Sequence, residues 1–104
     1  LVLLDPDGGV CASLASNHLP LGIAGPAQFD PFPARFRGER GGLLAAFSDG
    51  VLEAEREDGE AFGPGAALDA IRGAGAGRRV AALCAALKAH IGSDSPPDDA
   101  SALL

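Results

Sequence analysis

An aspartate at the end of an apolar run is the first pattern that could carry chemistry. Residues 43 to 47 are all apolar, and Ser48-Asp49-Gly50 follows them directly. Such a run is typical of a strand buried on both faces, and a strand end is a rigid mount for a metal ligand or catalytic group. Gly50 allows the backbone to turn tightly there. An ordinary Asp-Gly turn gives the same pattern, so Asp49 alone does not establish a site.

A pair of neighbouring carboxylates forms the second pattern. Asp98 and Asp99 stand before the apolar end of the sequence, Ala102-Leu103-Leu104. Adjacent carboxylates repel each other unless a cation neutralises them. Hard oxygen ligands of this type suit Mg²⁺ or Mn²⁺. The alternative interpretation is a solvated loop that follows a helix.

Together these segments resemble the metal-dependent (PPM-type) protein serine/threonine phosphatases, in particular their SpoIIE-like bacterial branch. In that branch a strand ends in Thr-Asp-Gly-Val-Thr-Glu-Ala, which stands here as Ser48-Asp49-Gly50-Val51-Leu52-Glu53-Ala54. Three further landmarks of the family occur in the family's order: Leu-Pro-Leu-Gly-Ile at 19–23, an acidic stretch leading to Phe-Gly at 58–63, and Asp-Asp-Ala-Ser at 98–101. Leu52 and Ala100 depart from the usual Thr and Ile, but no carboxylate is lost.

The resemblance implies a metal site and a reaction. Asp49 and Asp98 match the metal-binding aspartates of the C-terminal half of the family's domain, Gly50 matches the glycine that follows the first, and Asp99 ranks below Asp98. Two Mn²⁺ or Mg²⁺ ions would activate a bridging water for hydrolysis of phosphoserine or phosphothreonine. No catalytic side chain acts as a nucleophile in that scheme.

The resemblance also implies that part of the site lies elsewhere. The family takes further aspartates from its N-terminal half, and the acids near the start, Asp5 and Asp7, lie in an expected hairpin turn. There is no Met, even at position 1. We therefore expect residues 1–104 to be the C-terminal portion of a single phosphatase domain, inactive alone but active in its parent. The implied substrates are phosphorylated anti-sigma-factor antagonists, often under control of an attached sensor or receiver domain.

Two rival functions remain open at this point. A catalytically degenerate phosphatase-like module could bind a signalling partner. A serine hydrolase is the rival enzyme, because residues 46–50 approximate a Gly-x-Ser-x-Gly elbow around Ser48, with Asp69 and His90 following in triad order. Against the hydrolase, Ala46 stands where the first glycine is needed, and the chain is short for that fold.

Strands come first and helices later, which predicts an α+β fold; by resemblance it is part of a β-sandwich flanked by helices. The predicted elements are a hairpin of Leu1–Leu4 with Val10–Leu14, the start of a strand at Leu21–Ile23, an edge strand over 32–36, the buried strand Leu43–Phe47, helices over 65–72 and 78–91, and a terminal strand over 100–104. Residues 51–54 fit either a turn or a strand. In the second helix, one apolar stripe comprises Val80, Leu83, Cys84, Leu87 and Ile91.

Composition excludes several function classes. The formal net charge is −6, so nucleic acid and anionic membranes are repelled. Arg35, Arg37 and Arg40 form the densest basic stretch, which we interpret as solvated. The two cysteines lack CxxC spacing, which favours a reduced cytoplasmic protein. No apolar run approaches the roughly 20 residues of a membrane span.

Overall fold

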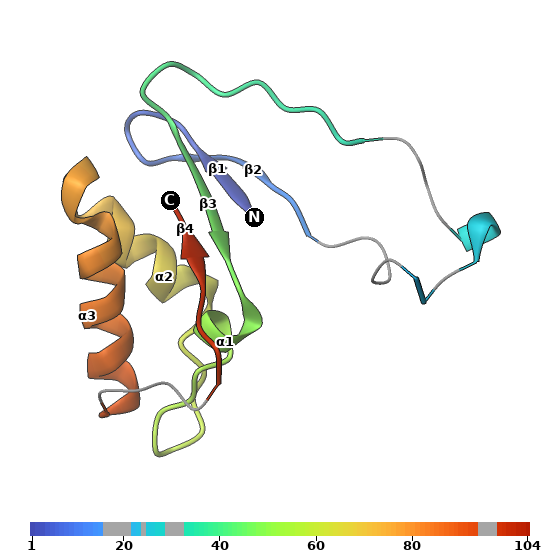
Figure 1. Cartoon of the computed structure of the whole chain (residues 1–104). Helices are drawn as coiled ribbons and strands as arrows, with labels where there is room; N and C mark the ends of the chain where they lie inside the picture. The colour runs from blue at the N-terminus through green and yellow to red at the C-terminus, as the bar shows by residue number, and fades with distance from the viewer. Residues whose placement is uncertain (16–21, 24, 29–32, 94–97) are drawn as a thin grey trace. The chain divides into compact units, whose positions relative to one another are not determined.

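The computed structural model describes residues 1–15, 22–23, 25–28, 33–93 and 98–104. The chain forms two compact units, Leu1–Leu43 and Leu44–Leu104. The predicted α+β class is confirmed, because strands come first, helices follow and a short strand ends the chain (Figure 1). Most of the Leu-Pro-Leu-Gly-Ile landmark lies outside the described residues.

The first unit contains the predicted hairpin. Strand β1 (Val2–Leu4) pairs antiparallel with β2 (Val10–Ser13), with an irregularity between Leu3 and Leu4. The Asp5 carboxylate closes the turn, since its Oδ1 accepts the backbone N–H groups of Asp7 at 2.9 Å and Gly9 at 2.7 Å. The Asp5 carboxylate is therefore hydrogen-bonded within its own turn, as expected for an Asx-type turn residue.

Two predicted strands of the first unit are wrong where the structure describes them. Residues 33–36 form neither helix nor strand, and Phe36 is 52% exposed. Pro33 cannot donate a ladder hydrogen bond, which weakens pairing despite the alternating pattern. Gly22 and Ile23 lie in a turn, where Gly22 has a φ of 92° that suits glycine. The short helical turn η1 (Pro26–Gln28) follows.

In the second unit, two strands flank the helices in sequence. Strand β3 (Leu43–Phe47) pairs antiparallel with β4 (Ala102–Leu103), with Ala46 opposite Leu103 and Phe47 opposite Ala102. The expected burial of β3 on both faces is wrong, because Leu44 is 46% exposed while Ala45 is fully buried. Side chains alternate along a strand, so an all-apolar run does not by itself show that both faces are covered.

Three α-helices connect these strands. Of the segment over 51–54, which fitted a turn or a strand, Val51 and Leu52 instead belong to the one-turn helix α1 (Asp49–Leu52), and the other two residues follow it. Helix α2 (Gly63–Arg72) carries Pro64 in its first turn, as expected. After the short turn η2 (Ala76–Arg78), helix α3 (Arg79–Ile91) ends at Gly92, whose φ of 68° and N–H bond to the Lys88 carbonyl at 3.0 Å close the helix.

Helices α2 and α3 pack together and bury the second unit's core (Figure 1). The buried apolar residues of this unit are Ala45, Val51, Ala54, Phe62, Ala67, Ile71, Leu83 and Leu87. The predicted α3 stripe is partly wrong, because Val80 is 57% exposed and Cys84 is also exposed. The half-buried Ala86 and His90 flank the buried leucines instead. Alanine and histidine do not mark a buried helix face strongly, so the hydrophobic pattern predicts a stripe that is rotated away from the face that is buried.

Among the helices that the structure describes, none combines the length and the hydropathy that a membrane span requires.

Candidate metal centre

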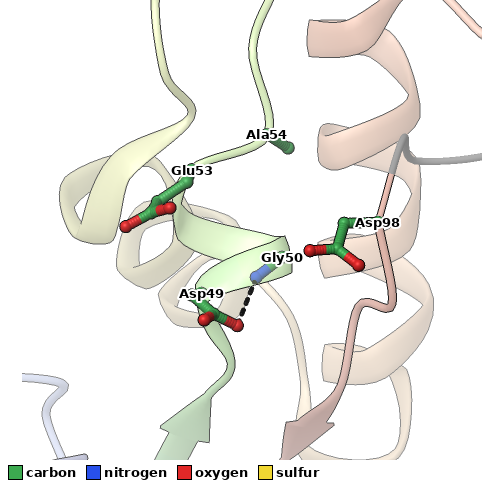
Figure 2. A pocket seen from close by; sticks show the side chains of 5 residues that line it. All are labelled: Asp49, Gly50, Glu53, Ala54 and Asp98. Carbon is green, nitrogen blue, oxygen red and sulfur yellow. Dashed lines mark hydrogen bonds between the residues drawn. The ribbon is translucent and has the colours of Figure 1, made fainter.

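An open pocket of about 130 Å³ lies where β3 ends and the C-terminal segment returns. It is lined by Asp49, Gly50, Glu53, Ala54 and Asp98 (Figure 2). Four of these residues belong to α1 and the segment after it, and Asp98 comes from the segment before β4. The pocket is therefore lined by residues of both sequence patterns, the Asp-Gly segment after the apolar run and the pair of neighbouring carboxylates.

Asp49 is the first residue of α1 and stands directly after β3. Its Oδ1 accepts the backbone N–H of Gly50 at 2.9 Å, while the side chain stays exposed to solvent. Asp98 has the same arrangement, because its Oδ1 accepts the backbone N–H of Asp99 at 2.7 Å. Each carboxylate is thus oriented by the N–H group of the next residue.

Ser48 fastens the two segments to each other. Its backbone N–H donates to the Ser101 carbonyl at 2.9 Å, and its hydroxyl oxygen accepts the Ser101 N–H at 2.9 Å. The same hydroxyl donates to the Asp99 carbonyl at 3.4 Å. Ser48 stands at the N-cap position of α1 but makes no side-chain capping bond to the helix. Its hydroxyl instead holds the Asp98-Asp99 segment beside Asp49.

Gly50 lets these segments approach closely. A Cβ atom at Gly50 would lie 2.2 Å from the Asp99 carbonyl oxygen and 2.9 Å from its carbon. Real side chains do not tolerate contacts that short, so only glycine fits without a backbone shift. The glycine that the sequence pattern singled out is therefore required by the backbone of the opposite segment.

The structure brings three of the four predicted site residues together at the pocket. Asp49, Gly50 and Asp98 line it, whereas Asp99 does not; its backbone carbonyl faces Gly50 and Ser48. Sequence reasoning missed Glu53 as a lining residue. The available signal was its spacing of four residues from Asp49, which is one helical turn.

Three acidic residues therefore line the pocket: Asp49, Glu53 and Asp98. The ion pairs found among the described residues join Arg56 to Asp58 and Glu60, and Arg72 to Asp69. None of these pairs involves a carboxylate that lines the pocket.

The donor chemistry fits part of a divalent metal site. Carboxylate oxygens are the ligands that Mg²⁺ and Mn²⁺ prefer. Within the described ranges, however, no group of three or more His, Cys, Asp or Glu side chains is placed closely enough to hold a metal ion. The described residues therefore bring no complete set of metal ligands together at this pocket.

The serine hydrolase interpretation is not supported by the contacts of its three residues. The Ser48 hydroxyl is bonded to backbone groups of Asp99 and Ser101. Asp69 pairs with Arg72 at 3.4 Å, and the Nε2 atom of His90 lies 2.8 Å from the Glu60 carbonyl oxygen. No proton relay joins the three side chains.

Comparison with known proteins gives one match. Neither the curated proteins nor the solved structures contain a match to the chain. The model of the family described as Stage II sporulation protein E (SpoIIE) matches residues 1–104. The match covers every landmark quoted above, including those at the pocket, and the chain therefore belongs to the SpoIIE family of PPM-type phosphatases.

Proposed function

We propose that this chain is part of a metal-dependent phosphatase that hydrolyses phosphoserine or phosphothreonine on a bacterial regulatory protein. Membership of the SpoIIE family supports a PPM phosphatase-related function. The observation that carries the proposal is that Asp49 and Asp98, which are distant in sequence, line one pocket. Ser48 and Gly50 hold the two segments together there.

Asp49 and Asp98 would hold the metal ion, and Gly50 would contribute through its backbone. Asp99, the second acid of the pair, ranks below Asp98 as a ligand. Mn²⁺ or Mg²⁺, when bound, supplies activation of a water and neutralisation of phosphate charge. The chain's own task is then to orient the carboxylates. The N–H groups of Gly50 and Asp99 perform it by bonding one oxygen of each neighbouring carboxylate.

We also propose that the chain covers only part of its catalytic domain. The order of the family landmarks supports residues 1–104 as the C-terminal portion of a single phosphatase domain. The two aspartates need further ligands to form a two-metal site, so the isolated chain would be inactive. We place the protein in the cytoplasm, which its two unpaired cysteines favour. Its substrate would be a phosphorylated protein such as an anti-sigma-factor antagonist, under control of an attached sensor or receiver domain.

The decisive experiment is Mn²⁺-dependent hydrolysis of a phosphoserine protein by the full-length protein. Asp49→Asn and Asp98→Asn should each reduce activity by orders of magnitude, because each removes a charged ligand at nearly constant volume. Asp69→Asn is the matched control, since Asp69 is exposed on α2 and pairs with Arg72. It should retain wild-type activity.

The same experiment distinguishes the phosphatase from a catalytically degenerate, partner-binding module. A folded full-length protein that stays inactive at saturating Mn²⁺ would contradict the phosphatase proposal. A degenerate module that binds a signalling partner would then be the better interpretation.

A further inference from the structure

The pairing of β3 with β4 is extended by one residue pair, Ser48 and Ser101. The register that places Phe47 opposite Ala102 also places Ser48 opposite Ser101 in the next position. In a hydrogen-bonded antiparallel pair, the N–H of each residue donates to the carbonyl of the other. One of these two bonds is present, because the Ser48 N–H donates to the Ser101 carbonyl at 2.9 Å. The return bond, from the Ser101 N–H to a carbonyl, is replaced by a different one.

The Ser48 hydroxyl takes the place of the Ser48 carbonyl in this pair. That carbonyl is turned into α1, where it accepts the N–H groups of Val51 at 3.2 Å and Leu52 at 3.3 Å. The Ser101 N–H donates to the Ser48 Oγ atom at 2.9 Å instead. The side chain therefore allows β3 to continue into α1 without leaving the Ser101 N–H unpaired, which would cost stability.

A series of hydrogen bonds joins this hydroxyl to the carboxylate of Asp98. The Ser48 hydroxyl donates to the Asp99 carbonyl at 3.4 Å, and the Asp99 N–H donates to the Asp98 Oδ1 atom at 2.7 Å. In the other direction Ser48 is the chain neighbour of Asp49, whose Oδ1 atom accepts the Gly50 N–H at 2.9 Å. Both aspartates line the pocket (Figure 2). Ser48 is therefore bonded to both segments that supply the pocket aspartates.

We propose that Ser48 is a positioning residue for the metal centre, and that its hydroxyl sets the affinity for the metal by fixing the Asp98 segment against the start of α1. The inference rests on the proposed function for the role of the two aspartates. Both capacities of the hydroxyl are used, because the oxygen accepts from Ser101 and the hydrogen is donated to Asp99. Groups that orient metal ligands typically change metal affinity 10- to 100-fold when removed.

Three substitutions at Ser48 isolate the hydroxyl. Ser48→Ala removes it and leaves the backbone bond to the Ser101 carbonyl in place. Ser48→Thr keeps it, and the extended backbone of Ser48, with a φ of −76° and a ψ of 166°, suits a β-branched side chain. Ser48→Cys keeps the shape of the side chain but offers only a weak donor and acceptor. The cysteine variant gives the same comparison if the alanine variant does not fold.

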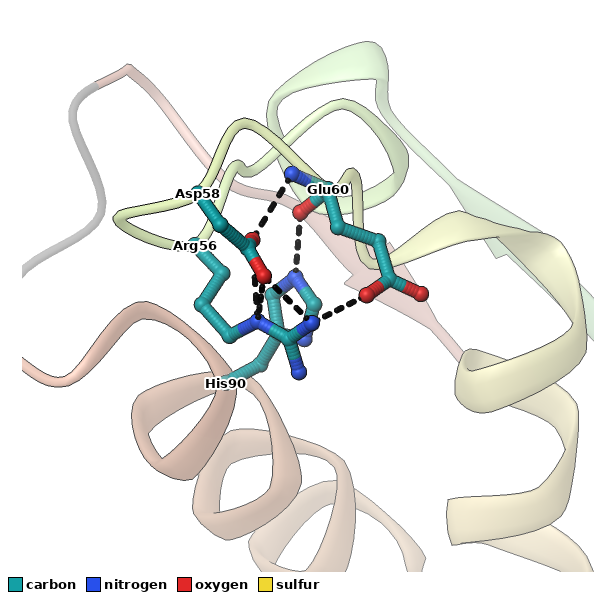
Figure 3. Close-up of polar contacts among 4 residues, drawn as sticks. All are labelled: Arg56, Asp58, Glu60 and His90. Atoms are coloured by element: carbon teal, nitrogen blue, oxygen red, sulfur yellow. Dashed lines mark hydrogen bonds and ion pairs between the residues drawn. The ribbon is translucent and has the colours of Figure 1, made fainter.

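Two control variants remove polar groups that have no part in the proposal. Ser101→Ala is the matched control, because Ser101 meets Ser48 through its backbone N–H and carbonyl. Arg56→Gln removes the ion pairs of Arg56 with Asp58 and Glu60 in the loop after α1 (Figure 3). None of these three loop residues lines the pocket. The controls therefore show what the loss of an unrelated polar group does to metal binding.

Mn²⁺ binding by the full-length protein is the measurement. Bound Mn²⁺ is obtained from the electron paramagnetic resonance signal of the unbound ion, well below the melting temperature of each variant. Ser48→Ala should weaken Mn²⁺ binding by about 10-fold, and Ser48→Cys should weaken it in the same direction. Ser48→Thr, Ser101→Ala and Arg56→Gln should bind Mn²⁺ like wild type.

Several results would overturn the inference. If Ser48→Ala melts earlier but binds Mn²⁺ like wild type, Ser48 has only a structural role. If Ser48→Thr or Ser101→Ala weakens binding as much as Ser48→Ala, the hydroxyl of Ser48 is not responsible.

The two proposals fail in different ways. Wild-type protein that binds Mn²⁺ but hydrolyses no phosphoserine protein would contradict the proposed function, and the binding measurements would still test the role of Ser48. Wild-type protein that binds no Mn²⁺ would overturn both proposals.

Discussion

The Asp99 carbonyl oxygen lies 2.2 Å from the point where a side chain on Gly50 would begin. This approach places the backbone before β4 directly against the first turn of α1. Asp49 and Asp98, the neighbours of these two residues, consequently line one pocket. The glycine in this motif is thus explained by packing of one backbone on another, and not by a turn that needs a positive φ, which Gly50 does not have.

Gly50→Ala should destabilise the protein. Alanine favours a helix by about 1 kcal/mol over glycine, but a Cβ atom here must displace the Asp99 backbone, and overpacking costs about 1–3 kcal/mol. Urea denaturation should therefore show a lower free energy of unfolding.

Gly65→Ala is the matched control in α2, because a Cβ atom at Gly65 has no neighbour within 4 Å. It should be neutral or up to about 1 kcal/mol stabilising. Equal stability changes in the two variants would contradict the steric explanation.

Ser48→Ala should loosen the segment that carries Asp98. The Ser48 hydroxyl accepts the Ser101 N–H at 2.9 Å, and loss of such a bond costs about 1 kcal/mol. Hydrogen exchange of the Ser101 amide should accelerate by several-fold. Ser48→Thr keeps the hydroxyl and should exchange like wild type; if the threonine variant exchanges as fast as the alanine variant, the hydroxyl is not the holding group.

Much of the candidate site was predictable, because it depends on motifs that are contiguous in sequence. Asp49 with Gly50, and Asp98, were identified and do line one pocket. The partner that holds the two segments together was not identified, since the Ser48–Ser101 bond joins residues far apart in the chain. Local patterns report spacing along one element but not which backbone groups meet across the fold.

The fold was predictable at the level of strong periodicity. The first hairpin, α2 and α3 were found, whereas the faces of β3 and α3 were not. Leu44 and Val80 fitted buried patterns, but they are 46% and 57% exposed. A hydrophobic pattern indicates which side chains prefer burial, but which face of an element is buried depends on the elements that pack against it.

Leu87→Ala should therefore cost far more stability than Val80→Ala. Leu87 is 8% exposed and Val80 is 57% exposed, although both belong to the predicted stripe of α3. Removal of a buried leucine costs about 2–5 kcal/mol, and an exposed substitution changes stability by about 0.5 kcal/mol or less. Similar losses from both variants in urea denaturation would show that the predicted stripe is buried after all.

Asp58 should titrate unusually low and make stability depend on pH in acid. Hydrogen bonding from Arg56, with help from the Glu60 N–H, lowers the pKa of Asp58 from 3.8 to about 2. The unfolded chain therefore binds more protons between these values. The stabilisation is complete above about pH 4 and is lost as pH falls through about 2.

An NMR titration of the Asp58 carboxylate measures this directly. Arg56→Gln should raise the pKa of Asp58 toward 3.8, whereas Arg72→Gln, which alters a different ion pair, should leave it unmoved. A titration midpoint that Arg56→Gln does not raise would contradict the assignment to Arg56.

Asp98→Asn should uncouple stability from metal without harming the metal-free fold. In the full-length protein without metal, the substitution replaces an exposed carboxylate with an amide of nearly the same size, so stability should stay within about 0.5 kcal/mol of wild type. Mn²⁺ at 100 times its dissociation constant should stabilise wild type by about 2.7 kcal/mol, and the variant should lose most of that gain. Asp69→Asn should keep it, because Asp69 pairs with Arg72 and not with the pocket. Thermal melts with Mn²⁺ and then with a chelator distinguish these cases, and an equal Mn²⁺ effect on all three proteins would exclude Asp98 as a ligand.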